Sequence, residues 1–363
     1  MEPMIIKSSS SSTTTVVVEN SFDSLFENIC NTVSDFNKVC IVSDEKVAGI
    51  YLSSVSECMK DKKVISFVVN EGEQSKDISV YLQIQKFLYD NNFNRNDLLI
   101  ALGGGVVGDL TGFVAATYKR GVPFVQIPTS LLAMTDSSIG GKTAVDFEGC
   151  KNIIGAFVSP KLVYVNTKVL DTLDLREFYC GMAEIMKAGL IVDSKFYVWL
   201  IDNNYEICEH QDEFMAEMIS HAQTIKKNIV EKDPFENGNR ALLNFGHTIG
   251  HGIEAAFAGE YKHGEAVSLG MVVASYISWK LNYIQMEDYY EIRDMFVLYH
   301  LPISVSVDKT KEILSFISKD KKNKDEHIRM ILLKRVGKAF IEEDVSKDLI
   351  KEALQEICFD DFD

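Results

Sequence analysis

Up to about residue 170, short and almost wholly apolar runs alternate with amphipathic stretches. The apolar runs are predicted strands and span residues 13–19, 38–44, 64–70, 97–102, 122–128 and 162–166. Between them, stretches such as residues 79–93 place apolar side chains at helical spacing. Strands that are apolar on both sides and alternate with helices are typical of a parallel sheet covered on both faces. The sequence therefore predicts an α/β fold for this part.

The pattern changes after about Asp171, where the strand signals stop. Long helical patterns follow at residues 176–192, 195–203, 211–231 and 265–281. The chain is therefore predicted to form an α/β domain at 1–172 and an all-helical domain at 173–363, with a cleft between them. No internal repeat is visible.

Composition excludes several classes of partner and location. A chain of 363 residues can form two domains with substantial cores. Its net charge of −16 repels nucleic acid and anionic membranes, so neither is expected as a partner. No apolar run approaches the roughly 18 residues of a membrane-spanning helix. The 7 cysteines are scattered without a CxxC motif, which predicts reduced thiols in the cytoplasm.

The Ser/Thr-rich start lacks the apolar core of a signal peptide and the arginines of a transit peptide. It is interpreted as a flexible lead into the strand at 13–19.

A glycine loop follows the strand at 97–102 and contains G-x-G-x-x-G as Gly103, Gly105 and Gly108. Glycines let the backbone approach a ligand, and a helix starting near Val106 would point its N–H groups at a phosphate. The motif is weak by itself, because no acidic residue follows at the distance that the dinucleotide fingerprint requires. A tight strand–helix turn without a ligand is the alternative.

The segment from Pro128 to Phe157 sets two lysines, Lys142 and Lys151, among small and apolar residues. Lysines in charged, helix-friendly runs are usually solvated, whereas Lys142 follows two glycines. This placement favours cations that bind a phosphate or carboxylate, with a plain surface role as the alternative.

Three of the chain's 7 histidines, His247, His251 and His263, lie within one short segment. The i, i+4 spacing of His247 and His251 suggests a metal-binding pair on one helix face. Glu184 and Lys187 lie at i, i+3 on an otherwise apolar helix, where they form either an internal ion pair or a metal carboxylate beside a substrate lysine. Glu184 with two histidines would make a three-ligand site with open positions for substrate.

Several motifs together resemble the 3-dehydroquinate synthase family. They are GGGVVGDLTGFVAATYKRG, VQIPTSLLAMTDSSIGGKTAVD, KNIIGAF, GMAEIMKAG, NRALLNFGHTIGHGIEA, HGEAVSLGM and DKK, in this order. The similarity covers roughly residues 40–338. It implies a Rossmann-like NAD-binding domain and a helical metal domain that enclose a phosphorylated sugar acid, a heptulosonate phosphate. It also implies a lyase of aromatic amino acid biosynthesis, in the shikimate pathway.

The resemblance assigns the histidines differently from their spacing. It implies Glu184, His247 and His263 as ligands of Zn²⁺, with Co²⁺ also possible, and makes His251 a proton-transfer residue. Glu236 stands at the family's proton-acceptor position. The implied catalytic residues are Glu236, His251, Lys142 and Arg240.

The resemblance also implies binding residues. Those for substrate are Asp136, Lys142, Asn152, Lys187, Lys226, Arg240, Asn244 and Lys321, with Arg120 supplied by the neighbouring subunit of a homodimer. Those for NAD⁺ are Asp44, Glu73, Lys76, Gly104, Gly105, Asp109, Thr129, Ser130 and Lys151. Asp44 ends a predicted strand, where a carboxylate can accept a ribose hydroxyl. Two departures from the family pattern are Pro234, before the loop that carries Glu236, and Cys180, at a position beside the cofactor in the family.

The implied reaction oxidises a hydroxyl with NAD⁺, eliminates phosphate, returns the hydride and closes a carbocycle. Three alternatives remain open. A metal-dependent polyol dehydrogenase needs no cage of cations. A cyclase for a sugar phosphate without the carboxylate would not need Lys226, Arg240 and Asn244 together. A non-enzymatic relative would be expected to have lost part of the metal set.

Overall fold

The structure is a computed structural model that describes residues 2–7, 13–236, 238–306, 309–318 and 327–358. The chain divides into two compact units. The first contains residues 1–174 and 210–234, and the second contains residues 175–209 and 235–363. The single boundary predicted after residue 172 lies close to the first crossing, but residues 210–234 return to the first unit.

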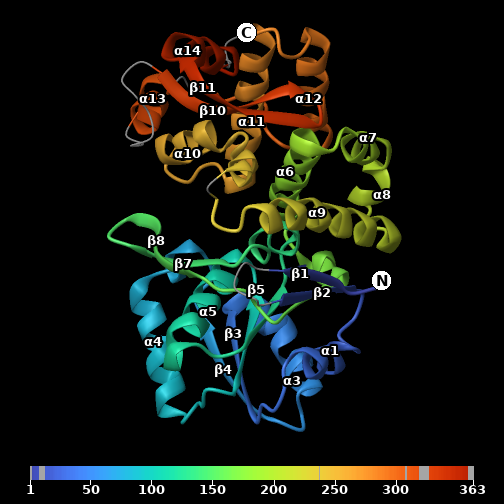
Figure 1. The fold of residues 1–363 in the computed structure, drawn as a ribbon, viewed down its shortest axis with the longest axis vertical. Coiled ribbons are helices and arrows are strands. Elements are labelled where there is room, and N and C mark those ends of the chain that lie inside the picture. The colour runs from blue at the N-terminus through green and yellow to red at the C-terminus, as the bar shows by residue number, and fades with distance from the viewer. Residues whose placement is uncertain (1, 8–12, 237, 307–308, 319–326, 359–363) are drawn as a thin grey trace. The chain divides into compact units, whose positions relative to one another are not determined.

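The first unit contains a seven-stranded sheet in the order β1-β2-β9-β6-β5-β3-β4 (Figure 1). Its strands are β1 Met4–Lys7, β2 Thr13–Glu19, β3 Lys38–Asp44, β4 Lys63–Val69, β5 Leu98–Gly103, β6 Phe124–Pro128 and β9 Leu162–Asn166. All neighbours are parallel except β1, which is antiparallel to β2. The predicted parallel sheet is confirmed. The expected flexible lead is wrong for β1, and residues 8–12 of it lie outside the described part.

Helices cover both faces of this sheet (Figure 1). They include α1 Leu25–Thr32, α2 Glu45–Val47, α3 Ser53–Cys58, α4 Ile78–Asp90 and α5 Gly105–Thr117. Consecutive residues of β3 enter different cores: Cys40 belongs to the same core as Leu88 of α4, whereas Ile41 belongs to the same core as Ile29 of α1. Since side chains alternate along a strand, a sheet with two buried faces needs apolar residues at both phases. This explains the continuous apolar runs.

Two further elements complete the first unit. The antiparallel hairpin of β7 Lys142–Phe147 and β8 Cys150–Phe157 packs on α5. The long helix α9 Asp212–Lys232 contacts β1, β2 and the turn at Ala133–Ser137. There the buried Gln223 side chain donates to the Met134 carbonyl at 2.8 Å. This contact helps to place α9 in the first unit.

The second unit is mainly helical. Its helices are α6 Leu175–Val192, α7 Ser194–Asp202, α8 Asn204–Cys208, α10 His247–Ala256, α11 His263–Lys280, α12 Met286–Leu298, α13 Thr310–Ser318 and α14 Lys347–Glu356. α11 is buried along most of its length. Among the described residues, no helix is both long and apolar enough to cross a membrane.

The expectation of an all-helical second domain is wrong in one respect. β10 His327–Arg335 and β11 Lys338–Ser346 form an antiparallel pair, and β10 packs on α11. Met330, Leu332 and Leu333 are all buried, so the strand shows a continuous apolar run. Such a run cannot be told from a buried helix by its periodicity.

Candidate metal centre and cofactor loop

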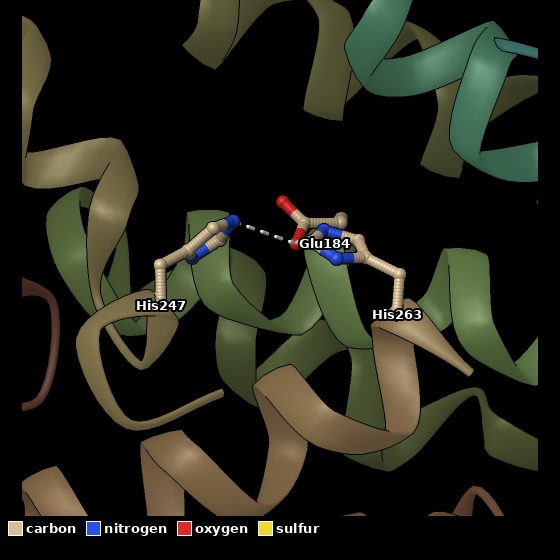
Figure 2. Close-up of side chains that lie close together, drawn as sticks. All are labelled: Glu184, His247 and His263. Carbon is tan, nitrogen blue, oxygen red and sulfur yellow. Dashed lines mark ion pairs between the residues drawn. The ribbon is translucent and has the colours of Figure 1, made fainter. Parts of the chain in front are cut away.

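Three helices of the second unit bring Glu184, His247 and His263 together (Figure 2). Glu184 lies within α6, and the two histidines are the first residues of α10 and α11. Oε1 of Glu184 lies 3.6 Å from Nε2 of His247 and 3.8 Å from Nε2 of His263. One carboxylate oxygen therefore faces two imidazole nitrogens, each at a distance longer than a hydrogen bond.

These residues fit a divalent cation. Glu184 is only 5% exposed, and its Oε1 has no hydrogen-bond partner among the described residues. A buried carboxylate oxygen without a partner is costly, and a cation would remove that cost. The candidate ligand atoms all lie within 4.8 Å of one another. One carboxylate and two imidazoles are a donor set that zinc accepts in catalytic sites.

The other oxygen of Glu184 is already paired. Lys187, one turn further along α6 and 2% exposed, donates to Oε2 of Glu184. Glu184 can therefore be both an ion-pair partner and a metal ligand, because Oε2 forms the ion pair with Lys187 while Oε1 stays available for a cation.

The environment shifts the pKa values of the two histidines in opposite directions. Burial, together with the charges of Lys187 and His263, holds the pKa of His247 well below 6.5. Neutral imidazole is the form that binds metals. Burial also lowers the pKa of His263, but the Glu254 carboxylate and Glu184 outweigh this effect and leave the pKa raised.

Close backbone contacts hold together the helices that carry the candidate ligands. A Cβ on Gly264, next to His263, would lie 2.3 Å from the carbonyl oxygen of Cys180 in α6. A Cβ on Gly270 of α11 would lie 2.0 Å from the carbonyl oxygen of Gly246, which precedes α10 and has φ of +81°. Only glycine permits such an approach of α11 to α6 and to the start of α10.

His251 lies one turn beyond His247 on α10 and is exposed. Its ring centroid lies 5.4 Å from that of His247 and 6.1 Å from that of His263. It belongs to a second cluster of possible ligands, with Glu254 and His263, and not to the Glu184 cluster. No sequence motif assigned a role to Glu254, although it follows His251 at i, i+3.

The remaining predicted residues of the second unit lie around a short 3-10 helix at Asn239–Asn244. The Asn244 side chain donates to Oε1 of Glu236 at 2.8 Å. Glu236 has φ of +59°, and Arg240 is 3% exposed. Lys321 lies outside the described residues.

The glycine loop of the first unit joins β5 to α5. A Cβ on Gly103 would lie 2.7 Å from the Val107 side chain, so the turn needs glycine there. The Thr129 amide donates to the Gly103 carbonyl at 3.0 Å, and Gly104 lies beside Ser130.

An ion pair lies near the first turn of α5. Nζ of the buried Lys76 lies 2.6 Å from Oδ2 of Asp109. Burial raises the pKa of Asp109, although Lys76 opposes the shift. Two of the positions predicted to bind NAD⁺ are thus paired with each other.

Three further residues predicted to bind NAD⁺ lie elsewhere in the first unit. Asp44 ends β3, and its side chain accepts from the Val47 amide at 2.9 Å as the N-cap of α2. Glu73 and Lys151 are exposed.

The predicted substrate residues of the first unit also have defined places. Lys226 of α9 donates to the carbonyl of Asp136 at 2.6 Å and pairs with its Oδ1 at 2.6 Å. Lys142 is exposed at the start of β7. Asn152 has φ of +56°, and its backbone N–H donates to Oδ1 of Asp146 at 2.7 Å. Arg120 is exposed, with φ of +65°.

Comparison with known proteins covers most of the chain. Residues 66–180 match the family model described as 3-dehydroquinate synthase N-terminal, and residues 181–323 match the C-terminal one. This chain belongs to the 3-dehydroquinate synthase family. A 3-dehydroquinate synthase of Colwellia psychrerythraea is 41% identical over 87% of this chain and 90% of its own. That of Thermoanaerobacter pseudethanolicus is 41% identical over 92% of this chain and 94% of its own.

Solved structures agree with this fold. A 2-deoxy-scyllo-inosose synthase complexed with carbaglucose-6-phosphate, NAD⁺ and Co²⁺ aligns with a TM-score of 0.88 and 25% identity, covering 98% of this chain and 99% of its own. The 2-epi-5-epi-valiolone synthase of Streptomyces hygroscopicus, with NAD⁺ and Zn²⁺ bound, aligns with a TM-score of 0.86 and 26% identity, covering 94% and 96%.

Proposed function

We propose that this protein is a carbon–oxygen lyase that converts 3-deoxy-D-arabino-heptulosonate 7-phosphate into 3-dehydroquinate and phosphate in the shikimate pathway. The observation that carries the proposal is membership of the 3-dehydroquinate synthase family together with the cluster of Glu184, His247 and His263. Curated relatives from several bacteria, 41–42% identical to this chain, are named 3-dehydroquinate synthase.

Glu184, His247 and His263 would hold the divalent metal. We favour Zn²⁺, with Co²⁺ as an alternative, because the donors are one carboxylate oxygen and two imidazole nitrogens. The bound ion would polarise a substrate hydroxyl and lower its pKa. Lys187 holds the second oxygen of Glu184, so the carboxylate presents Oε1.

Residues of the first unit would bind the dinucleotide. Bound NAD⁺ would supply reversible hydride transfer, with no net redox change. Gly104 and Gly105 permit a close approach of phosphate to the start of α5, where N–H groups are unpaired. Asp44 at the end of β3 would accept a ribose hydroxyl, and the other contacts are proposed at Glu73, Lys76, Asp109, Thr129, Ser130 and Lys151.

Protons would be moved by His251 and Glu236. His251 is exposed and lies one helical turn from a proposed ligand, so it can exchange protons with solvent and would lie near a substrate bound to the metal. The Asn244 amide orients Glu236 through their hydrogen bond. The residues proposed to bind the substrate are Arg120, Asp136, Lys142, Asn152, Lys187, Lys226, Arg240, Asn244 and Lys321. The lysines and arginines among them would supply the positive charge that its phosphate and carboxylate need.

The test is incubation of purified protein with the heptulosonate phosphate, NAD⁺ and Zn²⁺. Phosphate and 3-dehydroquinate should form in equal amounts without accumulation of NADH. NADH formed in proportion to glycerol oxidised, without phosphate release, would identify a polyol dehydrogenase. Turnover only of a sugar phosphate that lacks the carboxylate would identify another cyclase.

We further propose a cytoplasmic homodimer in which Arg120 completes the phosphate site of the partner. Arg120 is exposed at the end of the short helical turn after α5, and 7 free cysteines suit a reducing compartment. Homodimers of Arg120→Ala and of Glu184→Ala should each be nearly inactive. Random mixing gives mixed dimers with one good site in about half of cases, so roughly a quarter of wild-type activity should return. No recovery after verified subunit exchange would contradict this arrangement.

A further inference from the structure

The two proposed histidine ligands are arranged alike. Each directs Nε2 towards Oε1 of Glu184, at 3.6 Å for His247 and 3.8 Å for His263. Each also has an acceptor near its other nitrogen. Nδ1 of His247 lies 3.2 Å from the Phe245 carbonyl, and Nδ1 of His263 lies 3.6 Å from Oε1 of Glu254.

A metal that takes Nε2 of a neutral imidazole leaves the ring proton on Nδ1. That proton needs an acceptor, which fixes the tautomer and the ring orientation. Glu254 is suited to this role because its side chain is 18% exposed and it lies on α10, whereas His263 begins α11. The separation of 3.6 Å is an ion-pair distance, and an approach of a few tenths of an ångström would complete a hydrogen bond.

We propose that Glu254 is a positioning residue of the metal centre, whose carboxylate accepts the Nδ1 proton of His263 and directs Nε2 to the cation. This inference rests on the metal centre of the proposed function.

The alternative is that Glu254 is itself a metal ligand. The ligand atoms of His251, Glu254 and His263 also lie within 4.8 Å of one another, so these residues could bind a second cation. A neutral imidazole has only one free lone pair, so His263 cannot serve both cations without losing its remaining proton. His251 is moreover exposed, which favours hydration of its ring. The positioning role requires no such deprotonation.

The test is zinc binding by metal-free protein, measured in competition with a chromophoric chelator. Wild type should bind one ion per chain, and Glu254→Gln and Glu254→Ala should weaken binding by about 10- to 100-fold without changing that ratio. Glutamine keeps an acceptor but no charge, so its effect should be the smaller one. Glu260→Gln, an exposed glutamate six residues further along the chain, is the matched control and should bind like wild type. Circular dichroism of the metal-free variants checks their folding.

A double-mutant cycle separates positioning from ligation. If Glu254 acts only through His263, Glu254→Ala should have no further effect on zinc affinity in a His263→Ala background. Wild-type affinity in both Glu254 variants would overturn the proposal. So would two ions in wild type with one lost in Glu254→Ala, which would make Glu254 a ligand. Wild type without zinc binding, or undiminished binding in Glu184→Ala, would instead refute the proposed metal centre itself, and the role of Glu254 with it.

Discussion

Substitution of Gly264 by alanine should damage the proposed metal centre without replacing a proposed ligand. Gly264 follows His263, and a Cβ there would lie 2.3 Å from the Cys180 carbonyl oxygen and 2.4 Å from the Cys180 Cα. Both obstacles are backbone atoms, so no side-chain rotation can relieve the clash. To restore van der Waals contact near 3.5 Å, the start of α11 must move from α6 by roughly 1 Å.

The expected cost follows from this movement. Over-packing typically costs about 1–3 kcal/mol in unfolding free energy, and rigid obstacles put Gly264→Ala at the upper end, about 3 kcal/mol. For a unit of this size, that lowers the Tm of the metal-free protein by roughly 6–12 °C. A shift of roughly 1 Å also exceeds the tolerance of about 0.5 Å for a preorganised site, so zinc affinity should fall at least about 10-fold.

The assay pairs thermal unfolding of metal-free protein with chelator competition. Gly49→Ala is the control, because a Cβ at Gly49 meets nothing within 4 Å. It should leave zinc affinity unchanged and stabilise the fold by about 0.4–1 kcal/mol. If Gly264→Ala unfolds at the wild-type temperature and binds zinc as wild type does, the helices yield more easily than these contacts imply and the reasoning is refuted.

Three further outcomes are expected. His263→Ala should lose bound metal, whereas His251→Ala should keep it and lose about 10²–10⁴-fold in rate; metal analysis showing the reverse would favour the i, i+4 pair as ligands. Lys76→Met should cost about 3 kcal/mol near neutral pH, because it removes the ion-pair partner of the Asp109 carboxylate, whose side chain is only 19% exposed. Since burial raises the pKa of Asp109, this deficit should shrink in denaturant titrations as pH falls through that pKa, and a deficit independent of pH would contradict the assignment. Burial raises the pKa of Cys180 to about 12, so iodoacetamide at about pH 8 should alkylate it only in unfolded protein, as peptide mass analysis would check.

The sheet of the first unit was predictable because each strand carries its own signal. Cys40 and Ile41 enter different cores, so the strand that contains them is apolar throughout. The strand that contains Leu332 has a similar apolar run, but in the sequence it comes after a series of helices. Its partner strand does not alternate regularly between apolar and polar residues, so this pair of strands was not distinguished from helices. That α9 belongs to the first unit could not be predicted, because it depends on contacts between distant residues, such as Gln223 with Met134, and no local sequence pattern indicates them.

For the site, local spacing and family resemblance gave different answers. Spacing favoured His247 with His251, because both lie on one helix face. The structure instead places His247 and His263 at Glu184, since the contact of Gly264 with α6 brings a third helix to the site. This supports the ligand set that the resemblance implied. Long-range packing of this kind has no signature in the spacing of residues along one helix.

The interleaving of the two units has a consequence for how the protein is made. The chain completes α6, α7 and α8 of the second unit before it supplies α9 to the first. Asp136 leaves the ribosome 90 residues ahead of Lys226, its partner in the same unit. During synthesis the first unit therefore lacks α9 until residues 175–209 of the second unit have been made. No single break in the chain separates the two units, so a chimera of two relatives joined at one break would divide one of the units between its parents.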